Sequence, residues 1–562
     1  MPRITTFIFF LAIFLSSFFL AAQTDSTLYS SHSGLIAPLD IPLVLSGNFG
    51  EFRGDHFHTG LDFKTQGKEG FPVLAAADGM VSRVKVSPWG YGNALYLKHS
   101  NGTTTVYAHL SRYSIQIEDW LLKRQYLKRT FSVDTRPSFE IMYSAGDTIG
   151  WSGNSGSSGG PHLHFEVRDK DEHPINPLQW SFNIADSRPP EVGSLRVIPL
   201  DSQGCERRTE TMKVKAVQVY EIPSGKFRLA VEAKDRLDAA SNVCGVYSLE
   251  MYVDGNLYSS ISIDTLDFST NKDMNAHSYF PEWNSSRTQI HRFSPLPGNR
   301  LPIYGFTSIE DLVIVEDSTM NISVVASDAH GNKTTRKYVL LGGSPLPQSI
   351  DISKSNSVNA PVTNESGVML EKGGVEVVWS KMSFYSRENA SLQIFENGEF
   401  FIGPIDVPLA KSFKVTLDCP DGDCAKLLAV RLSENGTRLG VEICESSENK
   451  VFFSSRKMGR YKLARDTISP RLLPKFSATP LIENGDLVFH IEDDLSGVSK
   501  VEGFIDGKWM LLRLDPKKKT AIYKATDLQH IGGAKSQITV RVEDGVGNES
   551  FWVGSVEMLR SK

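Results

Sequence analysis

Short alternating runs of apolar and polar residues, separated by Gly, Asn and Asp, cover most of this chain, and such runs are typical of strands and turns. The densest stretch lies between Pro42 and Pro177. Within it, Asn93–Lys98 and Thr103–Ala108 flank an Asn-Gly pair, which supplies the positive φ angles of a tight hairpin turn. The pattern therefore predicts a mainly β protein with antiparallel pairing.

One segment interrupts this pattern. Between Ile117 and Thr130, larger side chains fall at helical spacing, and Lys and Arg residues add a basic side. We predict a helix inserted into the β domain. Two roles stay open for it: a helix packed beside the sheet, or a wall or lid over an active groove.

A weak internal repeat appears after Ser187, where the pattern remains β. Gly245–Gly255 aligns with Gly497–Gly507, and Ala326–Asn332 aligns with Val542–Asn548. Each copy alternates apolar and polar residues between Asp-Gly or Gly-Asn turns, as an immunoglobulin-like two-sheet sandwich requires. We therefore predict two related sandwiches.

The chain has 562 residues, which is too long for a single hydrophobic core. We expect a signal peptide at residues 1–23, a β-sheet domain with a helical insertion at 24–187, an immunoglobulin-like sandwich at 188–345, a further β-rich module at 346–465 and a second immunoglobulin-like sandwich at 466–562. Each sandwich is expected to bury its own core, so the domain at 24–187 should fold without them.

The amino terminus has the features of an export signal. Arg3 precedes an apolar run from Ile4 to Leu20, which ends in two alanines before polar residues. We predict cleavage and an exported protein, periplasmic or extracellular. An uncleaved membrane anchor is the alternative, because a run of this length almost spans a bilayer.

Composition excludes several classes of protein. With 40% hydrophobic residues, 22% charged residues and a net charge of -5, the chain is neither disordered nor suited to nucleic acid. Five cysteines leave at least one unpaired within the chain. Cys419 and Cys424 flank a turn that a disulfide could close, although two free thiols are the alternative.

Histidine and aspartate residues gather at even spacings in the first domain. In an extended strand, residues two or four apart point to one face, so His58 can share a face with Asp62, and His162 with His164. Two imidazoles and one carboxylate that converge make a zinc site with one position left open, as in catalytic zinc centres. His109 adds another imidazole, so two would remain for proton transfer.

Other motifs in this domain receive structural interpretations. We expect His56 and His99 to be ordinary structural residues. The Gly156–Gly160 segment matches the G-x-S-x-G nucleophile pattern, but a strand follows it where a helix would be required. The H-E-x-x-H pattern of helical zinc peptidases does not occur in the sequence.

Four motifs together resemble the lysostaphin-type (LytM-like) zinc endopeptidases, which cut peptide cross-bridges in bacterial cell walls. They are H-T-G-L-D at His58–Asp62, A-A-A-D-G-M-V at Ala75–Val81, Y-A-H-L-S at Tyr107–Ser111 and G-G-P-H-L-H-F-E at Gly159–Glu166. They occur in the family's order over Leu45–Pro177, which is less than a third of the chain.

This resemblance implies specific roles. His58, Asp62 and His164 would hold one Zn²⁺ per chain, and His109 and His162 would be the catalytic pair that moves protons. No other cofactor is implied.

The resemblance also implies a function and a substrate. The protein would be a zinc metalloendopeptidase that hydrolyses cross-links or stem peptides of peptidoglycan, with no nucleic-acid partner and with membrane contact only if the signal segment is uncleaved. The alternative is a non-catalytic wall-binding scaffold or an activator of other wall hydrolases. Two departures concern the groove rather than the chemistry: Gly159 replaces the family's usual Thr, and the stretch Arg112–Tyr143 is longer than usual.

Overall fold

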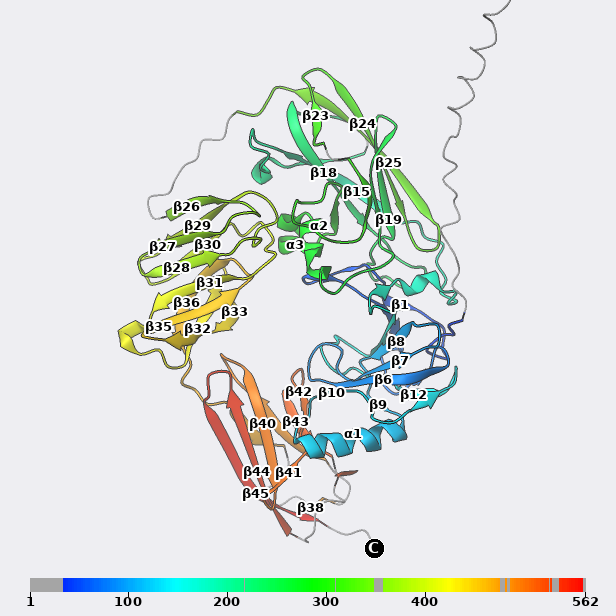
Figure 1. Ribbon diagram of the computed structural model, residues 1–562, viewed down its shortest axis with the longest axis vertical. Coiled ribbons are helices and arrows are strands. Elements are labelled where there is room, and N and C mark those ends of the chain that lie inside the picture. The colour runs from blue at the N-terminus through cyan, green and yellow to red at the C-terminus, as the bar shows by residue number, and fades with distance from the viewer. Residues whose placement is uncertain are drawn as a thin grey trace, which may run out of the picture.

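The computed structural model describes residues 34–558, apart from residues 217, 309, 348–356, 476–480, 483–485, 525 and 528–534. The predicted signal segment lies outside the described residues. The described chain is mainly β, as predicted, and almost all of its strand pairs are antiparallel. Four regions follow one another round a ring, so that the last lies beside helix α1 of the first (Figure 1).

One large β-sheet and two smaller ones form the first region, residues 34–187. Its strand order is β1 (Leu45–Gly47), β4 (Leu61–Lys64), β13 (His162–Arg168), β8 (Thr104–Ala108), β7 (Ala94–Lys98), β6 (Gly79–Val86) and β10 (Val133–Thr135), with β11 (Met142–Tyr143) on β6 and β14 (Pro174–Ile175) on β13. Smaller sheets are β5 (Pro72–Leu74), β12 (Thr148–Trp151) and β9 (Arg112–Tyr113), and β2 (Phe52–Arg53) with β3 (His56–Phe57). The predicted hairpin is confirmed as β7 and β8, but only Gly102 of its Asn-Gly pair has a positive φ.

The predicted insertion helix is confirmed as α1 (Ile115–Lys128). It starts two residues earlier than the sequence pattern suggested, and Ile117, Trp120 and Leu121 are buried on its inner side. Its outer side carries Tyr126, whose ring lies 5.3 Å from that of Trp509. The helix therefore packs on its own domain and also contacts the last region of the chain.

Two sheets make up the first sandwich, residues 188–345. One has the order β16 (Met212–Val214), β15 (Glu191–Pro199), β18 (Gly225–Lys234) and β21 (Ile290–Arg292), with β23 (Leu312–Ile314) on β18; the other has β17 (Val219–Pro223), β25 (Lys333–Gly343), β24 (Thr319–Ser327), β19 (Ser248–Val253), β20 (Asn256–Ser262) and β22 (Tyr304–Thr307). Helices α2 (Met274–His277) and α3 (Phe280–Ser286) lie between its strands in sequence.

The first sandwich does not bury a core of its own, contrary to our expectation. One continuous cluster of buried side chains runs through both regions, from Leu61 and Phe165 in the first region to Leu229 and Leu249 in the sandwich. Alternation in the sequence shows which side of a strand is buried, but it does not show against which neighbour. The two regions therefore form one hydrophobic unit.

Two further modules each consist of two sheets around a separate core. The middle module, residues 346–465, has β26 (Ser357–Val362), β29 (Glu388–Ile394), β30 (Phe400–Gly403), β36 (Gly459–Arg465), β32 (Leu427–Leu432) and β33 (Arg438–Ile443) in one sheet, and β27 (Val368–Lys372), β28 (Val375–Trp379), β31 (Phe413–Asp418), β35 (Lys450–Ser455) and β34 (Glu445–Ser447) in the other. The C-terminal sandwich, residues 466–558, has β37 (Arg471–Pro474), β39 (Leu487–Glu492), β43 (Thr520–Tyr523) and β42 (Arg513–Asp515) in one sheet, and β38 (Leu481–Ile482), β45 (Glu549–Met558), β44 (Lys535–Asp544), β40 (Val498–Ile505) and β41 (Lys508–Met510) in the other.

The middle module contains a disulfide between Cys419 and Cys424, which was one of the two alternatives for these cysteines. The two-sheet form agrees with the predicted sandwiches, whereas their immunoglobulin-like character and the domain boundaries stay predictions.

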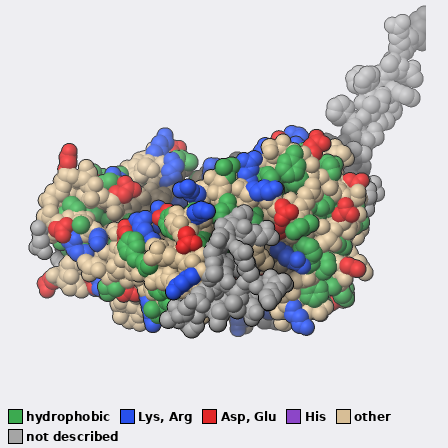
Figure 2. All heavy atoms as spheres, turned by 90° about the horizontal axis from the view of Figure 1, so that it is seen from below, with side chains coloured by type: hydrophobic (Ala, Val, Ile, Leu, Met, Phe, Trp, Pro, Cys, Tyr) green, Lys and Arg blue, Asp and Glu red, His purple; other side chains and the backbone are tan. Residues whose placement is uncertain are grey.

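Seen from below, the described surface mixes Lys and Arg with Asp and Glu (Figure 2).

Candidate metal centre

Three potential metal ligands lie together where β4 and β13 run side by side. The strand register places His164 opposite Asp62, and His58 lies three residues before β4 begins. His58 Nε2 lies 3.1 Å from Asp62 Oδ1, His164 Nδ1 lies 2.9 Å from the same oxygen, and the two nitrogens are 3.0 Å apart. All three side chains are buried. The cross-strand register brings Asp62 and His164 together, whereas His58, which was expected in the same strand as Asp62, reaches them from outside β4.

The outer ring nitrogens of both imidazoles are held by acceptors. His58 Nδ1 donates to the carbonyl oxygen of Asn48 at 2.8 Å, and His164 Nε2 donates to Glu166 Oε1 at 2.9 Å. Because a carbonyl or carboxylate only accepts, each of these nitrogens carries the proton. The inner nitrogens therefore face Asp62. Burial would lower the pKa of His164, but its hydrogen bonds to Asp62 and Glu166 raise it to about 9, so its inner nitrogen carries a proton that a bound cation would displace.

The carboxylate of Asp62 is held in the same way. Arg53 Nη2 donates to Asp62 Oδ2 at 2.8 Å, which leaves Oδ1 toward the two histidines. Gly47 makes this approach feasible, because a Cβ there would lie 2.2 Å from Arg53 Nη2. Burial alone would raise the pKa of Asp62, but the neighbouring histidines hold it well below its usual range. Three potential ligand atoms thus converge, as a bound cation requires.

Two further histidines lie beside this cluster. His109 follows β8 and its Nδ1 donates to the carbonyl oxygen of Ser155 at 2.9 Å. His162 begins β13, and its Nδ1 lies 2.8 Å from the carbonyl oxygen of Gly160 and 3.1 Å from Ser158 Oγ. The two rings are 4.7 Å apart between centroids. Both Nδ1 atoms are thus engaged, and His162 Nε2 lies 3.5 Å from Asp62 Oδ1, the oxygen that His58 and His164 also contact.

The environment of His109 favours a neutral ring. Burial, and to a smaller extent the neighbouring imidazoles of His164 and His162, lower the pKa of His109 to about 3. Its backbone has φ 60°, a conformation that is costly for a residue other than glycine and that recurs at functional sites. The His109 ring is therefore neutral and fixed, with no proton on Nε2.

Comparison with known proteins identifies a known domain in this part of the chain. Residues 56–137 match the sequence model of Peptidase family M23, a range that includes His58, Asp62 and His109. The chain carries an M23 peptidase domain of the lysostaphin type.

Several relatives match the M23 domain over part of their length. DD-carboxypeptidase/endopeptidase Mpg of Neisseria meningitidis serogroup B is 36% identical over 121 residues, 22% of this chain and 22% of the relative. Peptidoglycan DD-endopeptidase ShyA of Vibrio cholerae is 31% identical over 132 residues, 24% and 25% of the two chains. The chain thus spans about a quarter or less of these relatives. The solved catalytic domain of the M23 protein EnpA from Enterococcus faecalis has 27% identity and a TM-score of 0.19, and the alignment covers 26% of this chain and 95% of that one.

Glu166 is a site residue of the M23 domain to which we assigned no role from the sequence. Its carboxylate accepts hydrogen bonds from His164, Thr59, Tyr91 and Arg168. A signal was present, because residue 166 continues the even spacing of 162 and 164 along one strand face. Glu166 therefore orients the His164 ring.

The structure also shows the surroundings of His56, His99 and Gly159 in the M23 domain. His56 is exposed beside Asp55, and His99 is bound to the Asp78 carbonyl and to Thr105, so both are structural as expected. Gly159 leaves open space around its Cβ position. The hydroxyl of the preceding residue, Ser158, instead contacts the His162 ring.

A lysine of the C-terminal sandwich reaches the loop that holds the two outer histidines of the M23 domain. Lys517 Nζ donates to both the carbonyl and the side-chain oxygen of Asn154, and to the carbonyl oxygen of Ser158 at 3.0 Å. This contact joins residues more than 350 positions apart. Sequence patterns gave no sign of it.

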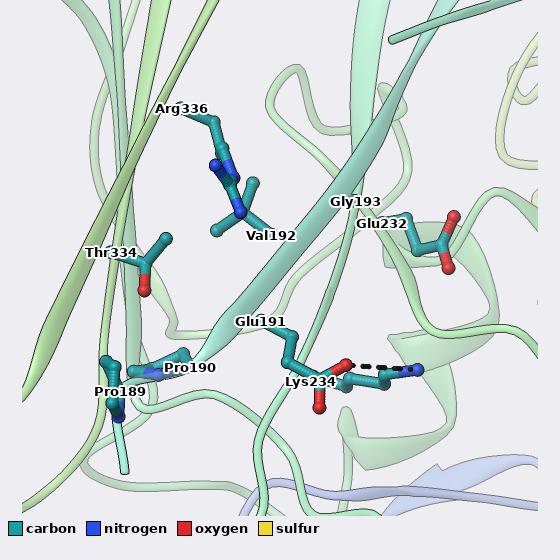
Figure 3. A pocket seen from close by; sticks show the side chains of 9 residues that line it. All are labelled: Pro189, Pro190, Glu191, Val192, Gly193, Glu232, Lys234, Thr334 and Arg336. Carbon is teal, nitrogen blue, oxygen red and sulfur yellow. Dashed lines mark ion pairs between the residues drawn. The ribbon is translucent and has the colours of Figure 1, made fainter. Parts of the chain in front are cut away.

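A surface pocket elsewhere has no contact with the histidines of the M23 domain. It lies in the first sandwich, where Glu191 and Lys234 form an ion pair of 3.4 Å across its floor (Figure 3). Another lining residue, Glu232, pairs with Arg196 outside the pocket. Among the described residues, no helix is both long and apolar enough to cross a membrane.

Proposed function

We propose that this protein is an exported zinc-dependent endopeptidase that hydrolyses peptide bonds in bacterial peptidoglycan. The observation that carries the proposal is the convergence of three potential ligand atoms, His58 Nε2, Asp62 Oδ1 and His164 Nδ1, within 3.1 Å of one another. Without a cation, His164 Nδ1 donates to Asp62 Oδ1, and a bound cation would replace that proton.

The donor set fits zinc. Two imidazole nitrogens and one carboxylate oxygen are ligands that Zn²⁺ prefers, and three protein ligands leave one position open, as in catalytic zinc sites. The partners Asn48, Glu166 and Arg53 hold the outer atoms of these ligands, as outer partners do in metalloenzymes. When bound, zinc supplies Lewis-acid polarisation of the scissile carbonyl and activation of water.

Proton transfer falls to His109 and His162. The neutral His109 ring can take up a proton at Nε2, because its Nδ1 proton is committed to Ser155. The His162 ring, held through Nδ1 by Gly160, presents its own Nε2 on the same side. One ring serves as base, and the other stabilises the developing negative charge or protonates the leaving amine.

The substrate class rests on relatives. ShyA is named a peptidoglycan DD-endopeptidase and Mpg a DD-carboxypeptidase/endopeptidase, and both match this chain over the M23 domain. An extended stem peptide also suits a β-lined site, since strands bind peptides through their backbones. The predicted export signal would deliver the protein to such a substrate.

Metal analysis and digestion of purified sacculi test the proposal. We expect about one zinc per full-length chain, and lower occupancy in His58→Ala, Asp62→Ala and His164→Ala. His109→Ala should retain zinc but release wall fragments about 100-fold more slowly, the usual scale for removing a positioned base. His56→Ala is the matched control, because this exposed histidine is two residues from His58 and should change neither result.

Two results would contradict the proposal. Full zinc retention in all three ligand variants would disprove the ligand assignment. A wild-type protein that holds zinc but releases no fragment from sacculi would instead favour the non-catalytic scaffold.

A further inference from the structure

We propose that each of the two aligned sandwiches binds one calcium ion, at a cluster of three aspartates where the chain enters the sandwich. These two sites lie outside the M23 domain and do not depend on its proposed activity. The first set comprises Asp186 and Asp328, whose ligand atoms gather with His330, and Asp235, which is buried close to them; the second consists of Asp466, Asp493 and Asp544.

The first cluster joins the linker to two loops of the first sandwich. Asp186 lies in the linker before β15, Asp235 follows β18 and Asp328 follows β24. Ligand atoms of Asp186, Asp328 and His330 lie within 4.8 Å of one another. Asp235 lies near this group: burial, and to a smaller extent the negative charges of Asp186 and Asp328, raise its pKa to about 7.

Buried oxygens in this cluster have no hydrogen-bond donor. Asp235 is 2% exposed, and its Oδ1 is buried without a hydrogen-bond partner. Asp186 Oδ2 is also buried without one, and its nearest charged group is the His330 imidazole, with Nδ1 at 3.4 Å. Buried carboxylate oxygens are costly unless a donor or a cation satisfies them.

The second cluster has the same design without a histidine. Ligand atoms of Asp466, Asp493 and Asp544 lie within 4.8 Å of one another. Asp466 and Asp544 are almost fully buried, and Asp493 Oδ1 is a buried atom with no hydrogen-bond partner. None of the three forms an ion pair with any Lys, Arg or His in the described part of the chain. No cationic side chain therefore balances their negative charge, although backbone amides donate to all three carboxylates.

In each cluster, an asparagine amide bridges one aspartate side chain and the backbone carbonyl of the linker aspartate. Asn332 Nδ2 donates to Asp328 at 2.8 Å and to the carbonyl oxygen of Asp186 at 3.2 Å. Asn548 Nδ2 donates to Asp544 at 2.7 Å, and it donates likewise to the carbonyl oxygen of the linker aspartate at 3.1 Å. The sequence repeat thus preserves a three-dimensional arrangement and not only a strand pattern.

Calcium matches these groups better than zinc does. Ca²⁺ binds carboxylate and carbonyl oxygens, with water completing six to eight ligands, whereas Zn²⁺ prefers nitrogen and sulfur. The group of Asp169, Asp171 and His173 differs, because Asp171 is exposed and pairs with Lys170. Calcium would tie each linker to two sandwich loops and so fix the junctions of the ring.

Calorimetric calcium titration of the full-length, zinc-loaded protein tests the proposal. We expect two calcium ions per chain, with dissociation constants of about 10⁻⁴ to 10⁻³ M, the range of extracellular calcium modules. Asp235→Asn and Asp493→Asn should each bind one calcium, and the double variant none, with zinc content unchanged. Asp494→Asn is the matched control, because this exposed neighbour lies outside the cluster and should leave both sites intact.

Thermal unfolding separates binding from folding. Asn keeps the shape of Asp and removes one like charge, so the variants should unfold at or above the wild-type temperature without calcium, and should lose the upward shift that calcium gives the wild type. Absence of calcium binding at ten times the expected range would overturn the proposal. So would binding that survives the double substitution, or a lower unfolding temperature of both variants in calcium-free buffer.

Discussion

The first and the C-terminal sandwich share an aligned repeat, yet they are attached to the M23 domain in different ways. The first sandwich continues the hydrophobic core of that domain, and Asn48 and Gly245 exchange two buried hydrogen bonds across the junction. The C-terminal sandwich has its own core and contacts the M23 domain through side chains such as Lys517 and Trp509.

This difference shows that a repeated fold can have two roles in one chain. A shared core stabilises both partners only when they are together, because separation exposes apolar surface at about 25 cal/mol per Å². A few polar and aromatic contacts contribute far less and can be broken without unfolding either partner. We infer that the first sandwich is part of the catalytic unit and that the C-terminal sandwich acts on it from outside.

The largest expected effect comes from dividing the chain at the two junctions. A chain that ends at residue 187 should fail to fold, because the buried rings of Phe52 and Phe57 would lose the rings of Trp283 and His277 against which they pack. A chain that ends at residue 465 should fold and bind zinc. Near-ultraviolet circular dichroism and metal analysis measure both. A folded, zinc-binding 24–187 fragment would restore the sequence-based expectation and remove the distinction.

A smaller effect is expected from one asparagine at the first junction. Asn271 accepts from the Phe57 amide and donates to its carbonyl, although the two residues are 214 positions apart. Asn271→Ala should lower the free energy of unfolding by about 2–4 kcal/mol, because both buried backbone groups lose their partner. Denaturant unfolding measures this. Asn284→Ala, on the exposed side of α3, is the control and should change little; equal effects would show that the junction is not special.

Acid should weaken the first junction more than the C-terminal sandwich. His291 is fully buried beside His277 and Phe52, and burial lowers the pKa of His291 to about 4. The folded state therefore favours the neutral ring, so stability is complete above about pH 6.5 and is lost as the pH falls toward 4. Between pH 6.5 and 5 the loss should be about 2 kcal/mol.

Thermal scans at these two pH values check this expectation. The transition of the catalytic unit should move down with acid, while the C-terminal sandwich, whose His490 is partly exposed, should move less. His291→Asn should flatten the pH dependence of the first transition. A pH dependence that is the same in this variant would place its origin elsewhere.

Local sequence patterns predicted the parts of the site that lie on one strand or one hairpin. Even spacing identified His162 and His164, and alternation identified the hairpin that carries His109. The same spacing includes Glu166, but we assigned it no role, because neither metal binding nor proton transfer required a further carboxylate. Residues that reach the site from other elements had no local signal: Arg53 approaches from the β2–β3 hairpin and depends on the absence of a side chain at Gly47.

The arrangement of the modules was less predictable for a related reason. Alternation fixes which strand face is buried, but the partner of that face depends on contacts between residues hundreds of positions apart. The shared core and the Lys517 contact are both of this kind. A single sequence contains no pairing information at such distances.

The smallest expected effect tests how the C-terminal sandwich acts on the M23 domain. Lys517 holds the loop that contains Ser155 and Ser158, which in turn position the rings of His109 and His162. Lys517→Met should lower kcat/KM on soluble stem peptides about fivefold, or about 1 kcal/mol, while zinc content stays the same. Lys518→Met is the control, because this exposed neighbour pairs with Asp515 instead. If only Lys517→Met is slow, the lysine side chain itself positions the loop. If both variants keep full activity and removal of the whole sandwich also has no effect, the contact orders nothing that catalysis needs. The sandwich must then serve wall binding or a partner.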